Sequence, residues 1–191
     1  MDAKPEIVAI CDTNEKLFSW YKENVPSIKQ YSTNHKEFLA NKDIEAVYCA
    51  VPHFMHQDIY IDIIRSKKHF LGEKPFGMDM QQNKNIMQAL TDNPGTLVRS
   101  SSEFPFYPGA QRIVELAANN AFGKILEVNA GFLHSSDLDP NKTINWKRQN
   151  SYNGEYGCMG DLGMHVFHLP LRLGWMPQTV FATLSKIVNE R

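Results

Sequence analysis

The chain has 191 residues, of which 20 are Lys or Arg and 21 are Asp or Glu, so its formal net charge is −1. This balance argues against a nucleic-acid binder or a protein of anionic membrane surfaces, because both need a basic excess. No apolar run approaches the length of a membrane span, and the first residues form no apolar signal segment. We therefore expect a cytoplasmic protein with no nucleic-acid or membrane partner.

The cysteines support the same compartment. Cys11, Cys49 and Cys158 are odd in number, far apart and without C-x-x-C spacing. They form neither a disulfide framework nor a zinc knuckle, which fits a reducing cytoplasm.

Strands and helices are expected to alternate through the first part of the chain. Short β-branched or apolar runs predict strands at residues 6–11, 44–51, 69–73 and 96–101, and amphipathic segments predict helices at 15–24, 35–41, 54–67, 80–90 and 109–119. This alternation predicts a doubly wound α/β fold with a parallel sheet and right-handed crossovers.

The pattern changes after Asn120. Lys124–Phe132 alternates like a half-exposed antiparallel strand, a polar loop follows from Ser135 to Asn153, and a helix is expected from Cys158 to about Leu173. Thr179–Val188 is expected to form another strand. We therefore place a domain boundary near residue 121, with a first domain at 1–120 and a second, α+β domain at 121–191 with a predominantly antiparallel sheet.

Three candidate site segments follow predicted strands. Ligands of such sheets bind outside the carboxyl ends of the strands. Asp12 follows the first strand, where an acid binds the ribose hydroxyls of NAD, although it is also suited to cap the next helix. Ala50-Val51-Pro52-His53-Phe54-Met55-His56 follows the second strand. The two histidines have H-x-x-H spacing, but no acidic ligand is nearby, so we predict no metal site.

The third strand ends at Gly72-Glu73-Lys74-Pro75. A lysine at a sheet edge is suited to acid–base work, although a solvated lysine in a turn has the same sequence pattern. The bond before Pro75 can be cis, which would fix the direction of the lysine.

A fourth candidate is the pair Asp161 and His165. Their i, i+4 spacing places them on one helix face, where an aspartate can orient the imidazole. The alternative is a core helix with a satisfied polar pair.

Taken in chain order, these segments resemble the Gfo/Idh/MocA oxidoreductases, which include glucose–fructose oxidoreductase and inositol dehydrogenase. The blocks that carry the resemblance are Asp12, Ile44-Glu45-Ala46-Val47 with Pro52 and His56, Lys68-His69-Phe70-Leu71-Gly72-Glu73-Lys74-Pro75, Gly123-Lys124-Ile125, Trp146-Lys147-Arg148 and Asp161-x-Gly163-x-His165. The resemblance covers nearly the whole chain.

The resemblance implies an NAD(P)-dependent oxidoreductase that transfers hydride between a nicotinamide and a sugar, cyclitol or related polyol. Lys74, Asp161 and His165 would be catalytic, with His165 the acid–base. The cofactor would contact Asp12, Ala50, Pro52, His53, His56, Glu73, Lys74, Trp146 and Arg148. Asp12 favours NAD over NADP, because its carboxylate repels a 2′-phosphate. Family members also form homo-oligomers through the open sheet.

The sequence departs from the family pattern. No strand with a G-x-G-x-x-G turn precedes Glu6, so the strands at 6–11 and 44–51 would lack their shared central neighbour. Only two strands of the large second sheet are expected, and Glu155, Tyr156 and His168 stand where relatives carry other residues. We therefore expect a chain shortened at both ends, with a partial dinucleotide-binding domain at 1–120 and a partial substrate and oligomerisation domain at 121–191. The activity is expected of the intact parent protein. A non-catalytic sugar or nucleotide sensor and a truncated, non-functional product are the alternative interpretations.

Overall fold

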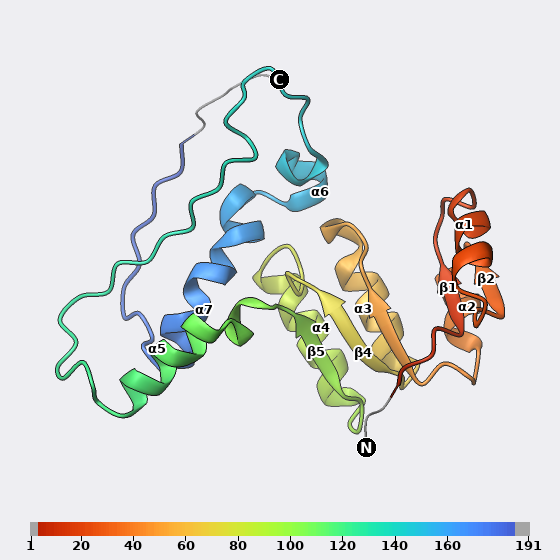
Figure 1. Ribbon diagram of the computed structural model, residues 1–191, viewed down its shortest axis with the longest axis horizontal. Coiled ribbons are helices and arrows are strands. Elements are labelled where there is room, and N and C mark those ends of the chain that lie inside the picture. Colours follow the sequence, from red (N-terminus) through yellow and green to blue (C-terminus); the bar gives the residue numbers. More distant parts are fainter. Residues whose placement is uncertain (1–3, 186–191) are drawn as a thin grey trace. The chain divides into compact units, whose positions relative to one another are not determined.

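The computed structural model describes residues 4–185, which separate into two compact units (Figure 1). Unit 1 takes the chain up to Val51 and then Met55–Ser100, and unit 2 takes Pro52–Phe54 and the chain from Ser101 onward. Every helix within residues 4–185 is too short or too polar to reach across a lipid bilayer. The two domains predicted from the sequence, 1–120 and 121–191, stay a prediction.

Unit 1 alternates strands and helices, which confirms the predicted α/β class. Its elements are β1 (Ala9–Cys11), α1 (Leu17–Asn24), β2 (Gln30–Ser32), α2 (His35–Ala40), β3 (Ala46–Cys49), α3 (His56–Arg65), β4 (His69–Glu73), α4 (Met80–Asp92) and β5 (Val98–Ser101). β1 pairs with β2 in parallel, and β3 pairs with β4 in parallel. The strand order is β1-β2 in one sheet and β3-β4-β5 in the other.

The sequence analysis missed β2, and the structure shows why. Gln30, Tyr31 and Ser32 form a three-residue strand with no apolar alternation, and it exists through its register with β1, where Ile10 pairs with Tyr31. β1 and β3 lie in different sheets, which agrees with the expectation that they lack a shared neighbour.

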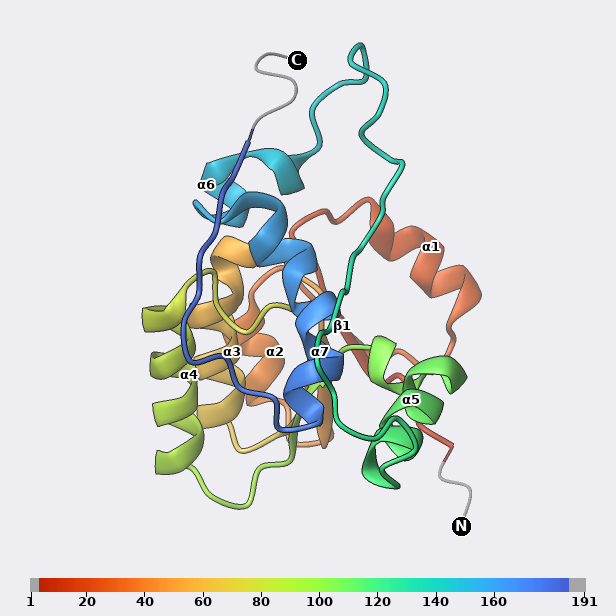
Figure 2. The same cartoon turned by 90° about the vertical axis from the view of Figure 1, so that its left-hand side faces the viewer.

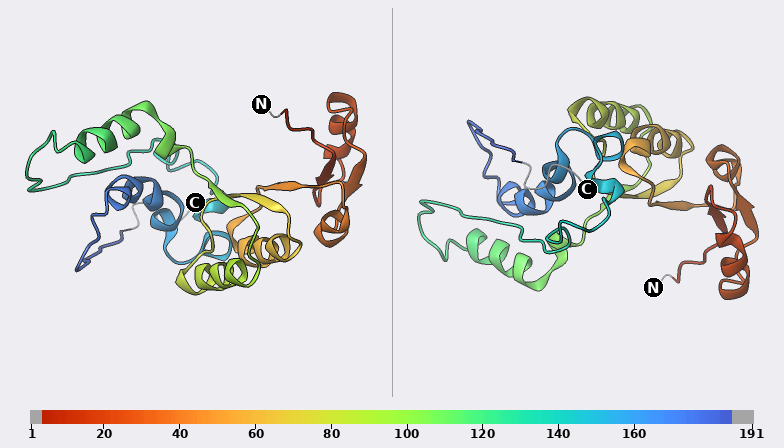
Figure 3. Two further views of the ribbon diagram at one scale, coloured as in Figure 1. Left: turned by 90° about the horizontal axis from the view of Figure 1, so that it is seen from below. Right: turned by 90° about the horizontal axis from the view of Figure 1, so that it is seen from above.

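The core of unit 1 lies between the three-stranded sheet and two helices. The buried residues of α3 recur at i, i+3, i+4, i+7 and i+8, namely His56, Ile59, Tyr60, Ile63 and Ile64. α4 lies beside α3 on the same face of the sheet (Figures 2 and 3) and contributes Ile86 and Ala89. The two helices cover the sheet residues Val47 and Phe70.

The opposite face of this sheet carries exposed side chains. Tyr48 of β3 is 60% exposed and Leu71 of β4 is 43% exposed, and the burial of both strands alternates residue by residue. The strand predicted at 44–51 is present as β3, and its alternate side chains are buried under the helices while the others are exposed.

Unit 2 is built from helices and extended segments. Its α-helices are α5 (Pro108–Ala118), α6 (Asn150–Asn153) and α7 (Met164–Arg172), with 3₁₀ turns at Phe104–Phe106 and Trp146–Arg148 and a π-helical turn at Met159–Gly163. The helix predicted from Cys158 to Leu173 is therefore a π turn followed by an α-helix. A Cβ at Gly163 would lie 3.0 Å from the Met159 side chain, so the turn is closely packed at this point.

The two strands predicted in the second domain are not found in the described residues. Lys124–Phe132 has no strand, and residues 121–131 are exposed throughout (Figure 1). Residues 179–185 also carry no strand, and the end of the predicted Thr179–Val188 strand lies outside the described residues. A strand is held by the main-chain hydrogen bonds of a neighbour and by burial of alternate side chains. Alternation in the sequence supplies neither, so the predicted antiparallel sheet is not formed here.

Candidate functional site

Asp12, Ala50–His56 and the Glu73-Lys74-Pro75 turn follow the carboxyl ends of β1, β3 and β4, as the sequence predicted. Asp12 is half-buried, and its Oδ1 accepts a hydrogen bond from the main-chain N–H of Asn14 at 2.8 Å. The contact is local to the turn and does not cap the next helix as the alternative interpretation expected, because the N-cap of α1 is Lys16. The structure therefore shows a local use for one carboxylate oxygen of Asp12, and its role toward a ribose stays a prediction.

The turn that carries Lys74 is held from several sides. The Lys74–Pro75 peptide is cis, which is the geometry that the sequence analysis considered. The Tyr60 hydroxyl donates to the main-chain oxygen of Glu73, and Asn83 Nδ2 donates to the main-chain oxygen of Phe76 at 2.9 Å. The direction of the lysine is thus set by main-chain contacts on both sides of it.

Gly77 closes this turn. Its φ of +94° is a conformation that L side chains rarely adopt, and a Cβ there would lie 2.8 Å from the main-chain nitrogen of Asn83. A glycine is therefore required where the chain turns from Lys74 into α4. The cap of α4 completes the connection, because Asp79 Oδ1 accepts from Gln82 N at 2.8 Å.

His56 supports the same turn from α3. Its ring is completely buried, with Nδ1 2.6 Å from the Pro75 oxygen and Nε2 2.9 Å from the Val51 oxygen. The ring also stacks on Tyr60, with centroids 4.5 Å apart. His56 thus connects the end of β3 with the loop after β4.

Burial sets the charge state of this ring. Burial lowers the pKa of His56, and the carbonyl oxygens of Pro75 and Val51 oppose that shift without reversing it. A neutral imidazole has one N–H and donates to one of the two oxygens, whereas an imidazolium donates to both.

Tyr48 is a residue of this region that the sequence analysis missed. Its hydroxyl donates to Glu73 Oε1 at 2.8 Å from the exposed face of the β3–β4 pair. The alternation of β3 would have placed Tyr48 on that face, but only the β3–β4 register brings it to Glu73.

His53 belongs to unit 2, where it contacts Asn153 and Trp146. Its Nδ1 is hydrogen-bonded to Asn153 Oδ1, and its ring packs edge-on against Trp146 at 5.3 Å. Asn153 Nδ2 donates to the Gly157 oxygen at 2.9 Å, which orients the amide so that His53 Nδ1 is the donor. The sequence analysis did not single out Asn153, which is 3% exposed.

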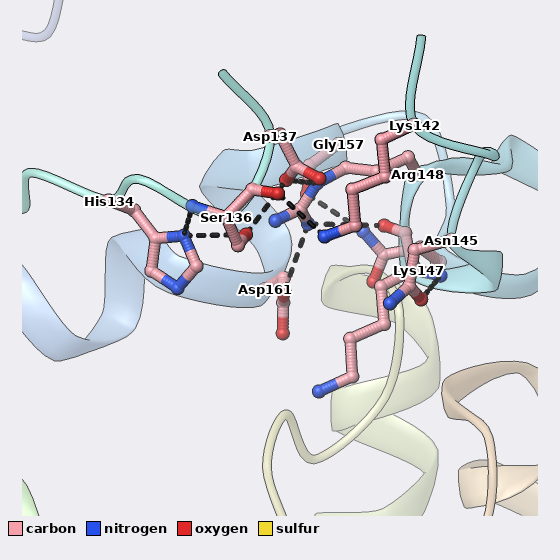
Figure 4. Close-up of polar contacts among 10 residues, drawn as sticks. His134, Ser136, Asp137, Lys142, Asn145, Lys147, Arg148, Gly157 and Asp161 are labelled. Atoms are coloured by element: carbon pink, nitrogen blue, oxygen red, sulfur yellow. Dashed lines mark hydrogen bonds and ion pairs between the residues drawn. The ribbon is translucent and has the colours of Figure 1, made fainter. Parts of the chain in front are cut away.

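Arg148 lies between two carboxylates (Figure 4). Its Nε is 2.8 Å from Asp137 Oδ2 and its Nη1 is 3.2 Å from Asp161 Oδ2. The hydrogen bond from Arg148 lowers the pKa of the Asp137 carboxyl. The structure therefore brings two predicted site residues, Arg148 and Asp161, into direct contact and adds Asp137, which the sequence analysis had left in a polar loop.

His165 lies in α7 among aromatic rings. It stacks on Phe104 with centroids 4.3 Å apart and faces Phe132 at 5.9 Å. Neither Phe104 nor Phe132 was singled out as a site residue in the sequence analysis. The role of His165 as the acid–base stays a prediction.

The predicted site residues divide between the two units. Asp12, Glu73, Lys74 and His56 belong to unit 1, whereas His53, Trp146, Arg148, Asp161 and His165 belong to unit 2. Across residues 4–185, no group of three or more His, Cys, Asp or Glu is arranged to hold a metal ion.

Comparisons with known proteins agree with the observed arrangement. A family model described as the oxidoreductase family with an NAD-binding Rossmann fold matches residues 1–99. A second, the GFO/IDH/MocA C-terminal domain, matches residues 110–191.

The individual relatives are longer than this chain. An uncharacterized oxidoreductase of Synechocystis sp. is 31% identical over 162 residues, which are 84% of this chain and 43% of that protein. Glucose-6-phosphate 3-dehydrogenase of Bacillus subtilis is 24% identical over 65% of this chain and 35% of its own length. Levoglucosan dehydrogenase in complex with NADH and levoglucosan has a TM-score of 0.81 at 23% identity, over 90% of this chain and 45% of that one. The chain thus spans less than half of each, and the structural likeness shows the fold.

Proposed function

The chain belongs to the Gfo/Idh/MocA oxidoreductase family, and from this we propose that the protein transfers hydride between a nicotinamide cofactor and a hydroxyl or carbonyl of a sugar, cyclitol or related polyol. Two similar proteins are named for such chemistry, glucose-6-phosphate 3-dehydrogenase and levoglucosan dehydrogenase. We propose that the protein works in the cytoplasm as a homo-oligomer.

The observation that carries this proposal is the turn around Lys74. A lysine at the carboxyl end of a parallel strand is placed where ligands of such sheets bind. Its neighbours Glu73, Pro75 and Phe76 are each held through a main-chain oxygen. So much support for one half-buried turn is expected where the direction of a side chain matters to chemistry.

Each proposed catalytic residue has a distinct role. When bound, the nicotinamide supplies the hydride acceptor or donor at its C4. In the oxidative direction His165 takes the proton of the substrate hydroxyl, and Lys74 stabilises the negative charge that develops on that oxygen. Asp161 holds the substrate or the imidazole in place. In reduction His165 returns the proton.

The cofactor assignment rests on strand ends. Asp12 follows β1, Pro52 follows β3 and Glu73 ends β4, and these positions fit the ribose and nicotinamide parts of a dinucleotide. The further cofactor contacts that we propose are made by Ala50, His53, His56, Lys74 and Trp146. The carboxylate of Asp12 favours NAD, because it can accept from ribose hydroxyls and repels a 2′-phosphate.

Substitution of Lys74 tests the proposal. In the intact parent protein, Lys74→Ala should lower kcat by orders of magnitude in a sugar and polyol panel with NAD. Lys84→Ala removes an exposed lysine from α4 and is the matched control. Normal turnover by Lys74→Ala would refute the role of the lysine. Binding of NAD and sugar without turnover by the wild type would favour a sensor.

A further inference from the structure

The Arg148 guanidinium joins two carboxylates that lie far apart in sequence, and the inference drawn from it rests on the proposed function. The Asp161 side chain is 2% exposed, whereas Asp137 is 31% exposed. An ionised carboxylate removed from water needs a compensating charge or hydrogen bonds, and Arg148 supplies both to Asp161. Asp137 is more exposed to water and needs a charged partner less. The contact with Asp161 is therefore the one that offsets the cost of burying a carboxylate.

Arg148 is itself held in a defined turn. Asn145 Oδ1 accepts from the main-chain N–H of Lys147 at 3.0 Å, and the Arg148 N–H donates to the Asn145 oxygen at 2.9 Å. The adjacent Trp146 packs against the buried ring of His53. The main chain that carries the Arg148 side chain is therefore held in one position.

The second carboxylate fixes the other end of the guanidinium. Asp137 sits in a loop that is tied to itself, since Ser136 Oγ is 2.8 Å from His134 Nδ1 and Lys142 Nζ donates to the Ser136 oxygen at 2.6 Å (Figure 4). With Nε engaged by Asp137, the plane of the guanidinium is set, and Nη1 is directed at Asp161. Fixing the plane in this way requires two donors in a rigid fork, which lysine does not have.

We propose that Arg148 is a positioning residue, which holds the Asp161 carboxylate ionised and in one orientation for the substrate, and that Asp137 keeps the guanidinium in the plane this requires. The assignment differs from the cofactor contact that the family resemblance implies for Arg148. In the structure its Nε and Nη1 are directed at protein carboxylates. The two roles predict different losses: a positioning residue affects turnover and sugar binding, whereas a cofactor contact affects NAD binding.

A double-mutant cycle tests the contact without any need for turnover. Arg148→Ala, Asp161→Asn and the double variant are compared by urea unfolding, with Lys147→Ala as the control that removes the neighbouring charge. The two substitutions should be strongly non-additive, because each removes the same contact. Carbon-13 titration of the Asp137 carboxyl should show its pKa rising toward the ordinary value in Arg148→Ala and unchanged in Lys147→Ala. Additive losses in the cycle would overturn the proposal.

Kinetics then test the positioning role. Arg148→Ala should lower kcat by up to about 100-fold, with the dissociation constant for NAD unchanged, and Asp161→Asn should add little to that loss. Arg148→Lys should recover only part of it, and Asp137→Asn should show a smaller loss than Arg148→Ala. Weakened NAD binding as the main effect would overturn the proposal in favour of a cofactor contact. These assays use the intact parent protein. Absence of turnover in its wild type would refute the proposed function, which the unfolding cycle distinguishes from failure of the Arg148–Asp161 contact.

Discussion

Removal of the His56 side chain should destabilise unit 1, because this ring connects the loop after β3 with the turn that carries Lys74. In His56→Ala the main-chain oxygen of Pro75 or of Val51 loses its buried hydrogen-bond donor. This loss lowers the free energy of unfolding by about 1–3 kcal/mol. The lost stack on Tyr60 adds about 0.5–1.5 kcal/mol. We expect a total loss of about 3 kcal/mol.

Urea unfolding followed by circular dichroism measures this loss. With a slope of about 2 kcal/mol per molar urea, the midpoint should fall by roughly 1.5 M. His56→Gln keeps an amide donor and should lose less. His134→Ala removes an exposed histidine and should stay within about 0.5 kcal/mol of the wild type. A midpoint for His56→Ala equal to that of His134→Ala would refute the reasoning.

The same variant has a predicted pH signature. Because burial lowers the pKa of His56 in the folded protein, the unfolded chain binds more protons below about pH 6.5, the ordinary value. The stability that the neutral ring contributes is present above that pH and is lost as the pH falls below it. Glu73 opposes the lowered pKa and Lys74 adds to it. The loss of stability between about pH 6.5 and about pH 5 should be smaller in His56→Ala than in the wild type.

Three further predictions concern burial. Ile86→Ala in α4 should cost about 3 kcal/mol in urea unfolding, because Ile86 is completely buried in the core; a loss below about 1 kcal/mol would contradict this packing. Lys68→Met should destabilise by about 1–3 kcal/mol, because the Lys68 amine donates to two main-chain oxygens, whereas the adjacent exposed Lys67→Met should not. Iodoacetamide at about pH 8 should label the exposed Cys158 well before Cys49, whose pKa burial raises to about 11; equal labelling rates measured by mass spectrometry would be against it.

The helices and most strands of unit 1 were predictable, because each carries its own local signal. The β-branched or apolar runs that became β3 and β4 and the apolar periodicity of α3 are visible in the sequence. The strand at Gln30–Ser32 was not predictable, since its three residues have no apolar alternation and gain strand geometry only from β1. The opposite error occurred at Lys124–Phe132. The apolar alternation is present there, but the described residues supply no neighbouring strand to pair with it.

The candidate site shows the same division. Lys74 could be selected from the Gly72-Glu73-Lys74-Pro75 segment, and Asp161 and His165 from their i, i+4 spacing. Each of these motifs lies within a few residues of the chain. Asp137 and Asn153 could not, because their partners Arg148 and His53 are 11 and 100 residues away. No local pattern marks such a contact.

The sequence by itself determined the α/β alternation, the family and the candidate chemistry, since these depend on residue type, periodicity and short spacing. Only the tertiary structure decided which carboxylate Arg148 meets, which main-chain oxygens surround His56 and which face of the β3–β4 sheet is covered. These features depend on hydrogen bonds and packing between segments distant in the chain. Their energy exists only once the chain has folded and brought those segments into contact.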